Sequence, residues 1–173
     1  MSEKELIISE EEIAKRITDI GREISNDFIG KKLVVVGILN GAFIFTADLV
    51  RAITIPLEID FIRVASYGSS TKSTGEIRLV KDLEISLGGK DVLLVEDIVD
   101  TGNTIDWLRE HLQGRGSSSI KLCTMISKQE RREIKVPVDY CGFNIQEGFL
   151  VGYGLDHAEQ YRHLPDIYLL KGT

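Results

Sequence analysis

The stretch VLLVEDIVDTGNTI, residues 92–105, changes from an aliphatic run to a cluster of acids within a few positions. The run at residues 91–95 is short and aliphatic, which predicts a strand buried on both faces of a parallel sheet. Glu96, Asp97 and Asp100 come directly after it. Carboxylates bunched in this way repel one another and are costly to remove from water. We therefore interpret the stretch as a binding site at the end of a buried strand.

The rest of the chain alternates between the two kinds of regular structure. Apolar residues at helical spacing follow an S-x-x-E capping box at Ser9 and Glu12 and predict a helix that ends by Gly30. Further helices are expected at 42–52 and 104–114, and strands at 33–39, 57–67, 91–95, 120–126, 138–143, 149–155 and 166–171. This alternation predicts an α/β fold with a mostly parallel central sheet flanked by helices, in a single domain over residues 1–173.

Composition limits the class of protein. The chain is 43% hydrophobic and 28% charged, which is ordinary for a globular domain. It contains no signal-peptide run and no apolar stretch long enough to cross a bilayer. Cys123 and Cys141 fit neither a CxxC motif nor a disulfide framework, so we expect reduced thiols in a cytoplasmic protein. The net charge of -6 disfavours nucleic acid as a partner and leaves a small anionic ligand at a local site.

The turn after the acids has the composition of a phosphate-binding loop. Thr101, Gly102, Asn103 and Thr104 lead into the predicted helix 104–114. Free N–H groups and the helix dipole at such a turn favour an anion. Carboxylates beside it suit ribose hydroxyls and Mg²⁺, and ligands of parallel sheets bind beyond the carboxyl ends of strands. Helix capping alone would need only one of the three acids.

Other nucleotide-binding and metal-binding motifs fit poorly. The chain has no G-x-x-x-x-G-K-[ST] sequence, and the G-x-G of Gly152 and Gly154 has His157 where a third glycine would stand. No cysteine or histidine cluster has zinc spacing. His111, His157 and His163 lack the context of a catalytic triad, so we expect surface or packing roles for them.

Residues 92–104 resemble the phosphoribosyl-diphosphate motif of type I phosphoribosyltransferases, in which two adjacent acids after a hydrophobic strand precede a D-T-G-x-T loop. The resemblance extends over nearly the whole chain and is closest to the hypoxanthine-guanine group. It implies the type I fold with a small hood built from the chain ends. It also implies transfer of the 5-phosphoribosyl group from 5-phosphoribosyl 1-diphosphate to N9 of hypoxanthine or guanine, Mg²⁺ as cofactor, and a homodimer or homotetramer.

The same resemblance implies a role for each matching position. Asp100 would be the general base or acid at purine N7. The other roles are ribose and metal binding by Glu96 and Asp97; 5-phosphate binding by Thr101, Gly102, Asn103 and Thr104; diphosphate binding by Asn40, Gly41 and Arg162; a lid at Ser66 and Tyr67; purine binding by Lys128, Phe149, Leu150 and Asp156; and a second metal contact at Asp156.

Three finer expectations accompany these roles. The small polar segment 68–76 is expected to be an exposed loop that closes over the reactants. The Leu39–Asn40 peptide is expected to be cis, although Asn40 is neutral where the family frequently has a basic residue. The helix that contains Phe43 and Phe45 is expected to supply apolar surface to an oligomer.

Ordinary alternatives exist for each single position. Lys128 stands among the charges of residues 129–132 and could be a solvated loop residue, while Phe149 could be core, Asp156 a cap and Arg162 a surface charge. A non-catalytic regulator that senses phosphoribosyl diphosphate and binds nucleic acid is a rival function. Among enzymes, a lysine donor argues against adenine, whereas xanthine stays open.

Overall fold

The computed structural model describes residues 3–67 and 76–173. Its main sheet has the order β4-β3-β2-β5-β6-β7, and every adjacent pair is parallel except β3 and β4. The strands are β2 Leu33–Leu39, β3 Leu57–Tyr67, β4 Glu76–Lys81, β5 Asp91–Val99, β6 Ser119–Ser127 and β7 Tyr140–Asn144. The predicted α/β fold with a mostly parallel sheet is therefore confirmed.

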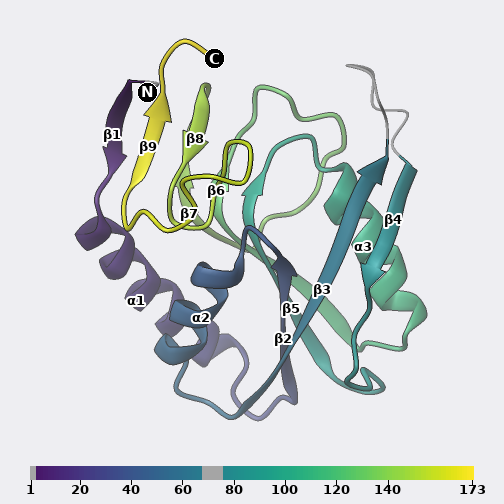
Figure 1. Cartoon of the computed structure of the whole chain (residues 1–173). Helices are drawn as coiled ribbons and strands as arrows, with labels where there is room; N and C mark the ends of the chain where they lie inside the picture. The colour runs from purple at the N-terminus through teal and green to yellow at the C-terminus, as the bar shows by residue number, and fades with distance from the viewer. Residues whose placement is uncertain (1–2, 68–75) are drawn as a thin grey trace.

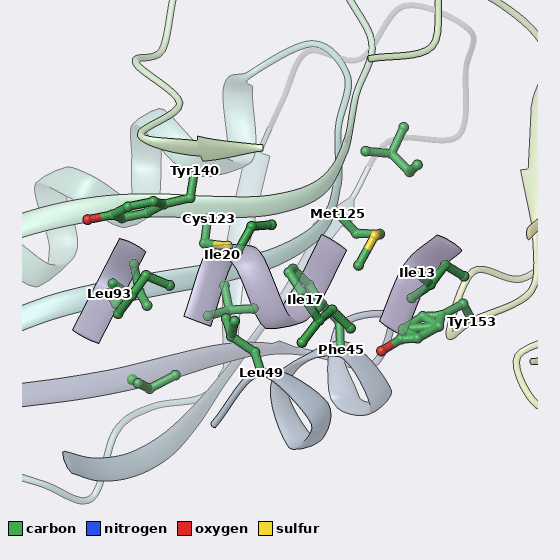
Figure 2. Close-up of a cluster of buried hydrophobic side chains, with 14 of the residues drawn as sticks. Ile13, Ile17, Ile20, Phe45, Leu49, Leu93, Cys123, Met125, Tyr140 and Tyr153 are labelled. Atoms are coloured by element: carbon green, nitrogen blue, oxygen red, sulfur yellow. The ribbon is translucent and has the colours of Figure 1, made fainter. Parts of the chain in front are cut away.

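Helices cover both faces of this sheet (Figure 1). Helices α1 (Glu10–Asp27) and α2 (Phe43–Ala52) pack on one face, and α3 (Asn103–Gly114) packs on the other. Alternate residues of each central strand point to opposite faces, so Leu93 joins the first core cluster and Leu94 the second. Figure 2 shows the first cluster, in which isoleucines of α1 meet Phe45 and Leu49 of α2. In the described ranges, no helix is long and apolar enough to span a membrane.

Helix α1 begins as the sequence predicts and ends three residues before Gly30. Ser9 accepts a hydrogen bond from the Glu12 amide, and the Glu12 side chain accepts one from the Ser9 amide, so the capping box is formed. Gly21 lies on the buried face, where an added Cβ would stand 2.5 Å from the Ala52 carbonyl. A glycine at this position allows α1 and α2 to approach closely.

A second, smaller sheet joins the two ends of the chain. Strands β1 (Lys4–Ile8), β9 (Ile167–Leu170) and β8 (Phe149–Val151) pair antiparallel in that order. This is the expected hood built from the chain ends, and it lies beside the carboxyl end of the main sheet (Figure 1). Strands β1 and β4 were not predicted, because both are largely exposed edge strands without a buried aliphatic run.

The direction in which successive strands are added to the main sheet changes between the neighbouring strands β2 and β5. From β2 the chain continues outward to β3 and β4, whereas from β5 it continues outward to β6 and β7 on the other side. Ligands of open α/β sheets bind at such a point, beyond the carboxyl ends of the strands. Strand β5 extends to Val99, so Glu96 and Asp97 lie within its last residues. The prediction of a strand over 91–95 had placed both acids after the strand. The two acids therefore lie at the point where the strand order changes direction.

Candidate active site

The turn between β5 and α3 forms a small pocket of about 110 Å³. Asp100, Thr101 and Thr104 are among the residues that line it. Gly102 has φ of 91°, and a side chain there would meet the Ile134 carbonyl at 2.5 Å, so only glycine fits this turn. The N-cap residue Gly102 has no side chain, and the Asn103 amide makes only a long contact of 3.4 Å with the Thr101 hydroxyl. Within the described residues, this leaves the other N–H groups of the first turn and the positive end of the helix dipole to an anion. The pocket has the size and polarity that a phosphate group requires.

Two acidic side chains lie beside this pocket at the end of β5. Glu96 is buried, and its Oε1 accepts a hydrogen bond from the Asp97 amide at 2.9 Å. Removal from water raises the pKa of Glu96 well above its ordinary value, and the neighbouring Asp97 charge raises it further. Removal from water also raises the pKa of Asp97, although hydrogen bonds and the charge of Arg162 oppose the shift. A cation or sugar hydroxyls would relieve this unfavourable burial.

The donor set of this pair is compatible with Mg²⁺. Mg²⁺ is usually held by one or two carboxylates together with substrate phosphates and water, not by a cage of protein ligands. Across residues 3–67 and 76–173, no group of three or more acidic, histidine or cysteine side chains is arranged to hold a metal ion. Asp156 is thus not gathered with Glu96 and Asp97. Two adjacent buried carboxylates with raised pKa values nevertheless fit an ion that is completed by its substrate.

The loop after β2 packs directly on the acid pair. The Leu39–Asn40 peptide is cis, as the resemblance implied. A Cβ added to Gly41 would overlap the Asp97 carboxylate, and one added to Gly154 would overlap the Gly41 carbonyl. Two glycines therefore bring three segments into contact: the end of β2, the end of β5 and the turn after β8. Gly154 has φ of 95°, which also favours glycine.

Arg162 connects this contact to Asp156. Its Nη1 donates to the Gly154 carbonyl at 2.8 Å, and its Nη2 lies 3.3 Å from Oδ1 of Asp156. Asp156 Oδ2 also accepts a hydrogen bond from the Glu159 amide at 2.9 Å. The charge of Arg162 partly offsets the rise that burial causes in the Asp97 pKa, so the arginine and this acid interact electrostatically. The diphosphate-binding role expected for Arg162 stays a prediction.

Asp100 begins the phosphate turn. Its Oδ1 is buried without a hydrogen-bond partner among the described residues, and its Oδ2 lies 3.5 Å from the Arg131 guanidinium. A buried acceptor without a donor is unfavourable in the free protein, whereas the Asp100 side chain as a whole is 30% exposed, so a ligand can reach the carboxylate. The pocket of the phosphate turn includes Asp100 in its lining, so a ligand bound at the turn lies next to this carboxylate.

Lys128 at the end of β6 is not a solvated loop charge. Only 8% of it is exposed, and its Nζ donates to the Gly148 carbonyl at 2.8 Å. Its backbone amide donates to the Val99 carbonyl, so the ends of β6 and β5 are joined. An ammonium group has three donors, and one of them is used here. Lys128 therefore presents a buried positive donor beside the phosphate turn.

The residues expected to bind a purine follow in the hood. Phe149 is 42% exposed, so it is not the core residue that a lone phenylalanine would suggest, whereas the Leu150 side chain is buried. His157 meets the Phe149 ring edge-on, with ring centroids 5.1 Å apart. This ring contact is a packing role, as the sequence indicated for His157.

The expected lid joins two strands. Ser66 and Tyr67 end β3, and Glu76 begins β4, antiparallel to it. The residues between them, 68–75, lie outside the described part of the chain. Ser66 and Tyr67 therefore stand on the strand next to β2, on the side of the sheet that carries the expected diphosphate loop.

A segment that sequence reasoning passed over supports the phosphate turn. The amides of Glu133 and Ile134 both donate to the Thr101 carbonyl, and the Asn103 side chain donates to Glu133 at 2.7 Å. Arg132 donates to the Asp100 carbonyl at 2.8 Å. The only signal in the sequence was a run of charges after Lys128, which is common in loops that do nothing of this kind.

Comparison with known proteins gives one consistent result. A family model described as a phosphoribosyl transferase domain matches residues 7–158. The chain is 47% identical over 163 residues to a hypoxanthine phosphoribosyltransferase of Salmonella typhimurium, with 93% of this chain and 92% of that protein covered. It is 43% identical over 168 residues to a hypoxanthine-guanine phosphoribosyltransferase of Bacillus subtilis, with 97% and 93% covered.

Solved structures agree with these relatives. A hypoxanthine phosphoribosyltransferase of Staphylococcus aureus superposes with a TM-score of 0.93 at 43% identity, covering 96% of this chain and 91% of that chain. A hypoxanthine phosphoribosyl transferase of Trypanosoma cruzi, described in a study of its C-terminal region, oligomeric state and activity, has a TM-score of 0.92 at 38% identity, with 98% and 92% covered.

Proposed function

The chain belongs to the phosphoribosyltransferase family, in its hypoxanthine-guanine group, and we propose how its own residues carry out that group's reaction. The enzyme transfers the 5-phosphoribosyl group from 5-phosphoribosyl 1-diphosphate to N9 of hypoxanthine or guanine, which gives IMP or GMP and diphosphate in purine salvage. One observation carries the assignment of residues. The acid pair and the phosphate pocket lie at the carboxyl end of β5, and the buried Lys128 directly follows the neighbouring strand β6.

The phosphate turn binds the 5-phosphate of the sugar. Its free amides at the start of α3 and the hydroxyls of Thr101 and Thr104 donate to the phosphate oxygens, together with Asn103. Glu96 and Asp97 then lie beside the ribose, where they accept hydrogen bonds from its hydroxyls. As diphosphate leaves, positive charge develops on the ribose ring, and two fixed carboxylates nearby favour that charge in the transition state.

Asp100 takes the proton from purine N7. When N9 forms its bond to the ribose carbon, the proton on N7 must leave, and the carboxylate of Asp100, which lines the pocket of the phosphate turn, is the acceptor. Arg131 lies 3.5 Å from the other carboxylate oxygen and is 68% exposed, so it holds Asp100 weakly and leaves it free to accept the proton.

The purine lies between β6 and the hood. Lys128 keeps its bond to the Gly148 carbonyl and directs its remaining donors to O6, which hypoxanthine and guanine share. Phe149 stacks on the base, and its exposed ring is held edge-on by His157. Backbone groups of Leu150 meet the C2 side of the purine.

The diphosphate lies against the loop after β2. Asn40 and Gly41 offer backbone groups, and Arg162 offers its guanidinium. Glu96 and Asp97 would hold one Mg²⁺ and Asp156 a second. When bound, Mg²⁺ neutralises charge on the departing diphosphate oxygens. Ser66 and Tyr67 close over the reactants as part of the lid and exclude water that would hydrolyse the activated sugar.

The protein acts as a homodimer or homotetramer. Phe43 and Ile59 are each 43% exposed and Val80 is 53% exposed. Ile59 and Val80 point away from the core cluster that α3 covers, toward the face that carries α2 and Phe43. Phe45 is fully buried in the chain's own core, so Phe43 is the aromatic residue through which this helix would supply apolar surface. The free thiols Cys123 and Cys141 accord with a cytoplasmic location.

A panel of bases tests this function. Nucleotide formation is measured with hypoxanthine, guanine, xanthine, adenine and uracil in the presence of 5-phosphoribosyl 1-diphosphate and Mg²⁺. We expect turnover with hypoxanthine and guanine and little with adenine, and xanthine shows how strictly the C2 position is read. A mobility-shift assay with nucleic acid runs beside it. Nucleic-acid binding without nucleotide formation would support the rival regulator instead.

A further inference from the structure

Arg132 lies outside the proposed substrate-binding residues, yet its guanidinium contacts both strand ends of the site. Its Nε donates to the backbone carbonyl of Asp100 at 2.8 Å, and its Nη2 donates to the backbone carbonyl of Lys128 at 2.9 Å. Nη2 also lies 3.3 Å from the Val99 carbonyl and 3.2 Å from the Ser127 hydroxyl. One side chain thus joins the end of β5, with the proton acceptor, to the end of β6, with the purine-binding lysine.

We infer that Arg132 is a positioning residue that sets Asp100 and Lys128 at the separation one purine requires. This inference rests on the proposed function, in which Asp100 meets N7 and Lys128 meets O6. These two atoms lie on the same edge of a 6-oxopurine. The two side chains must therefore be correctly placed relative to each other, and a small error in that separation weakens one contact whenever the other is made.

Neither functional side chain fixes this separation by its own contacts. Oδ1 of Asp100 has no partner among the described residues, and its ion pair with the largely exposed Arg131 is of a kind that contributes little. Lys128 is bound at its tip to Gly148, in the hood rather than in β5. The backbone on each side is what remains. The Lys128 amide already joins it to Val99 in β5, and Arg132 adds the link to the Asp100 carbonyl, beyond the last residue of that strand.

The chemistry of a guanidinium group suits this role. It is planar, always charged, and presents several donors in fixed directions, so it can hold two carbonyl groups in one geometry. A lysine at position 132 would keep the charge but offer a single nitrogen. The Nε and Nη2 groups of Arg132 already donate to protein oxygens, so we assign it no direct contact with substrate.

Steady-state kinetics of Arg132→Lys and Arg132→Ala test the inference. Lys135→Ala is the matched control, since Lys135 is an exposed cation in the same segment. Hypoxanthine and 5-phosphoribosyl 1-diphosphate are varied separately. We expect kcat to fall by about 10- to 100-fold and KM for hypoxanthine to rise in both Arg132 variants, because misplacement by about 1 Å can cost ~10²-fold. Lys135→Ala should stay within about twofold of wild type, as surface substitutions usually do.

A double-mutant cycle separates positioning from general support of the fold. If Arg132 acts through Lys128, Arg132→Lys combined with Lys128→Ala should lose less activity than the product of the two single losses. A loss equal to that product, or wild-type kcat and KM in Arg132→Lys, overturns the inference. Arg132→Lys carries the test if Arg132→Ala does not fold. Absence of nucleotide formation in the wild type would instead refute the proposed function.

Discussion

Glu96 and Asp97 are adjacent acids, and removal from water raises the pKa of both. An acid whose pKa is higher in the folded than in the unfolded chain binds more protons when folded. Its contribution to stability is present below the ordinary glutamate pKa of 4.5 and is lost as pH rises through the folded-state value. At pH 7 the pair therefore destabilises the free protein, and we interpret the two acids as retained for binding.

Glu96→Gln should consequently unfold at a higher temperature than wild type at pH 7. The expected gain is a few degrees, because about 1 kcal/mol corresponds to ~2–4 °C for a chain of this size. The gain should be smaller at pH 4 than at pH 7, because raised pKa values keep more of both acids protonated as pH falls, and activity should be lost at any pH. Thermal unfolding at the two pH values measures this, with Glu110→Gln on the exposed side of α3 as the control. A lower unfolding temperature for Glu96→Gln at pH 7 would contradict the conclusion that the two buried acids destabilise the free protein.

Asp100→Asn should keep the fold and lose most turnover. An amide has the same shape as the carboxyl group but cannot take the N7 proton, and general acid–base groups contribute about 10²–10⁴-fold. Because Oδ1 of Asp100 has no hydrogen-bond partner in the described part of the chain, stability should change little. Measurement of kcat together with thermal unfolding checks both parts. A variant that retains kcat within about threefold of wild type would exclude Asp100 from proton transfer.

Lys128→Ala should raise KM for hypoxanthine and guanine by about tenfold or more, since a hydrogen bond from a charged group is worth about 1.5–3 kcal/mol. The bond from Nζ to the Gly148 carbonyl changes what we expect for adenine. The lysine keeps its bond to the Gly148 carbonyl when adenine binds. Discrimination between oxopurines and adenine therefore comes mainly from the contact to O6, which adenine lacks. The gap between oxopurines and adenine should narrow in the variant. Lys32→Ala, at the opposite end of β2, is the control, and an unchanged kcat/KM for hypoxanthine would remove Lys128 from base recognition.

At the scale of elements, the sequence predicts best where local signals and burial agree. The capping box of α1 and the aliphatic strands β2, β5 and β6 were correctly located because each carries a strong local pattern, although β5 runs on to Val99, beyond its aliphatic run. Strand β4 was missed because it is an edge strand with no buried aliphatic run, and β1 because its stability comes from pairing with β9 near the other end of the chain. The same reason explains Arg132, whose partners lie on two strand ends that only the fold brings together.

Contact between elements makes Gly41→Ala a sharp test of the site. An added Cβ would overlap the Asp97 carboxylate, so either the loop after β2 or Asp97 must move. Because both are placed in substrate binding, we expect kcat/KM to fall by about 10²-fold, the effect of a shift near 1 Å. Gly88→Ala is the matched control, since its Cβ would meet nothing closer than 3.9 Å. Equal activity of the two variants would show that this contact does not matter.

At the scale of the whole molecule, the site depends on segments from both ends of the chain. In the hood, β9 pairs with β1 on one side and with β8 on the other. The turn after β8 in turn contacts the loop after β2. Helix α2 begins directly after that loop, at Phe43. Any contact that fixes the start of α2 therefore also fixes the loop that we expect to bind diphosphate.

A subunit interface at Phe43 would provide such a contact, and it can be tested by substitution. Phe43 is 43% exposed, and a large apolar side chain left in water at the start of a helix is better accounted for by a partner than by the monomer. Phe43→Ser should shift the assembly toward monomer at micromolar concentration, as measured by light scattering and sedimentation. Activity should fall with it, through a higher KM for 5-phosphoribosyl 1-diphosphate, because the diphosphate loop loses its support. Ile29→Ser is the matched control, since Ile29 is 69% exposed beyond the far end of α1 and should leave the assembly unchanged. A wild-type protein that is monomeric under the same conditions, or a Phe43→Ser variant that assembles as wild type does, would show that this face is not the interface.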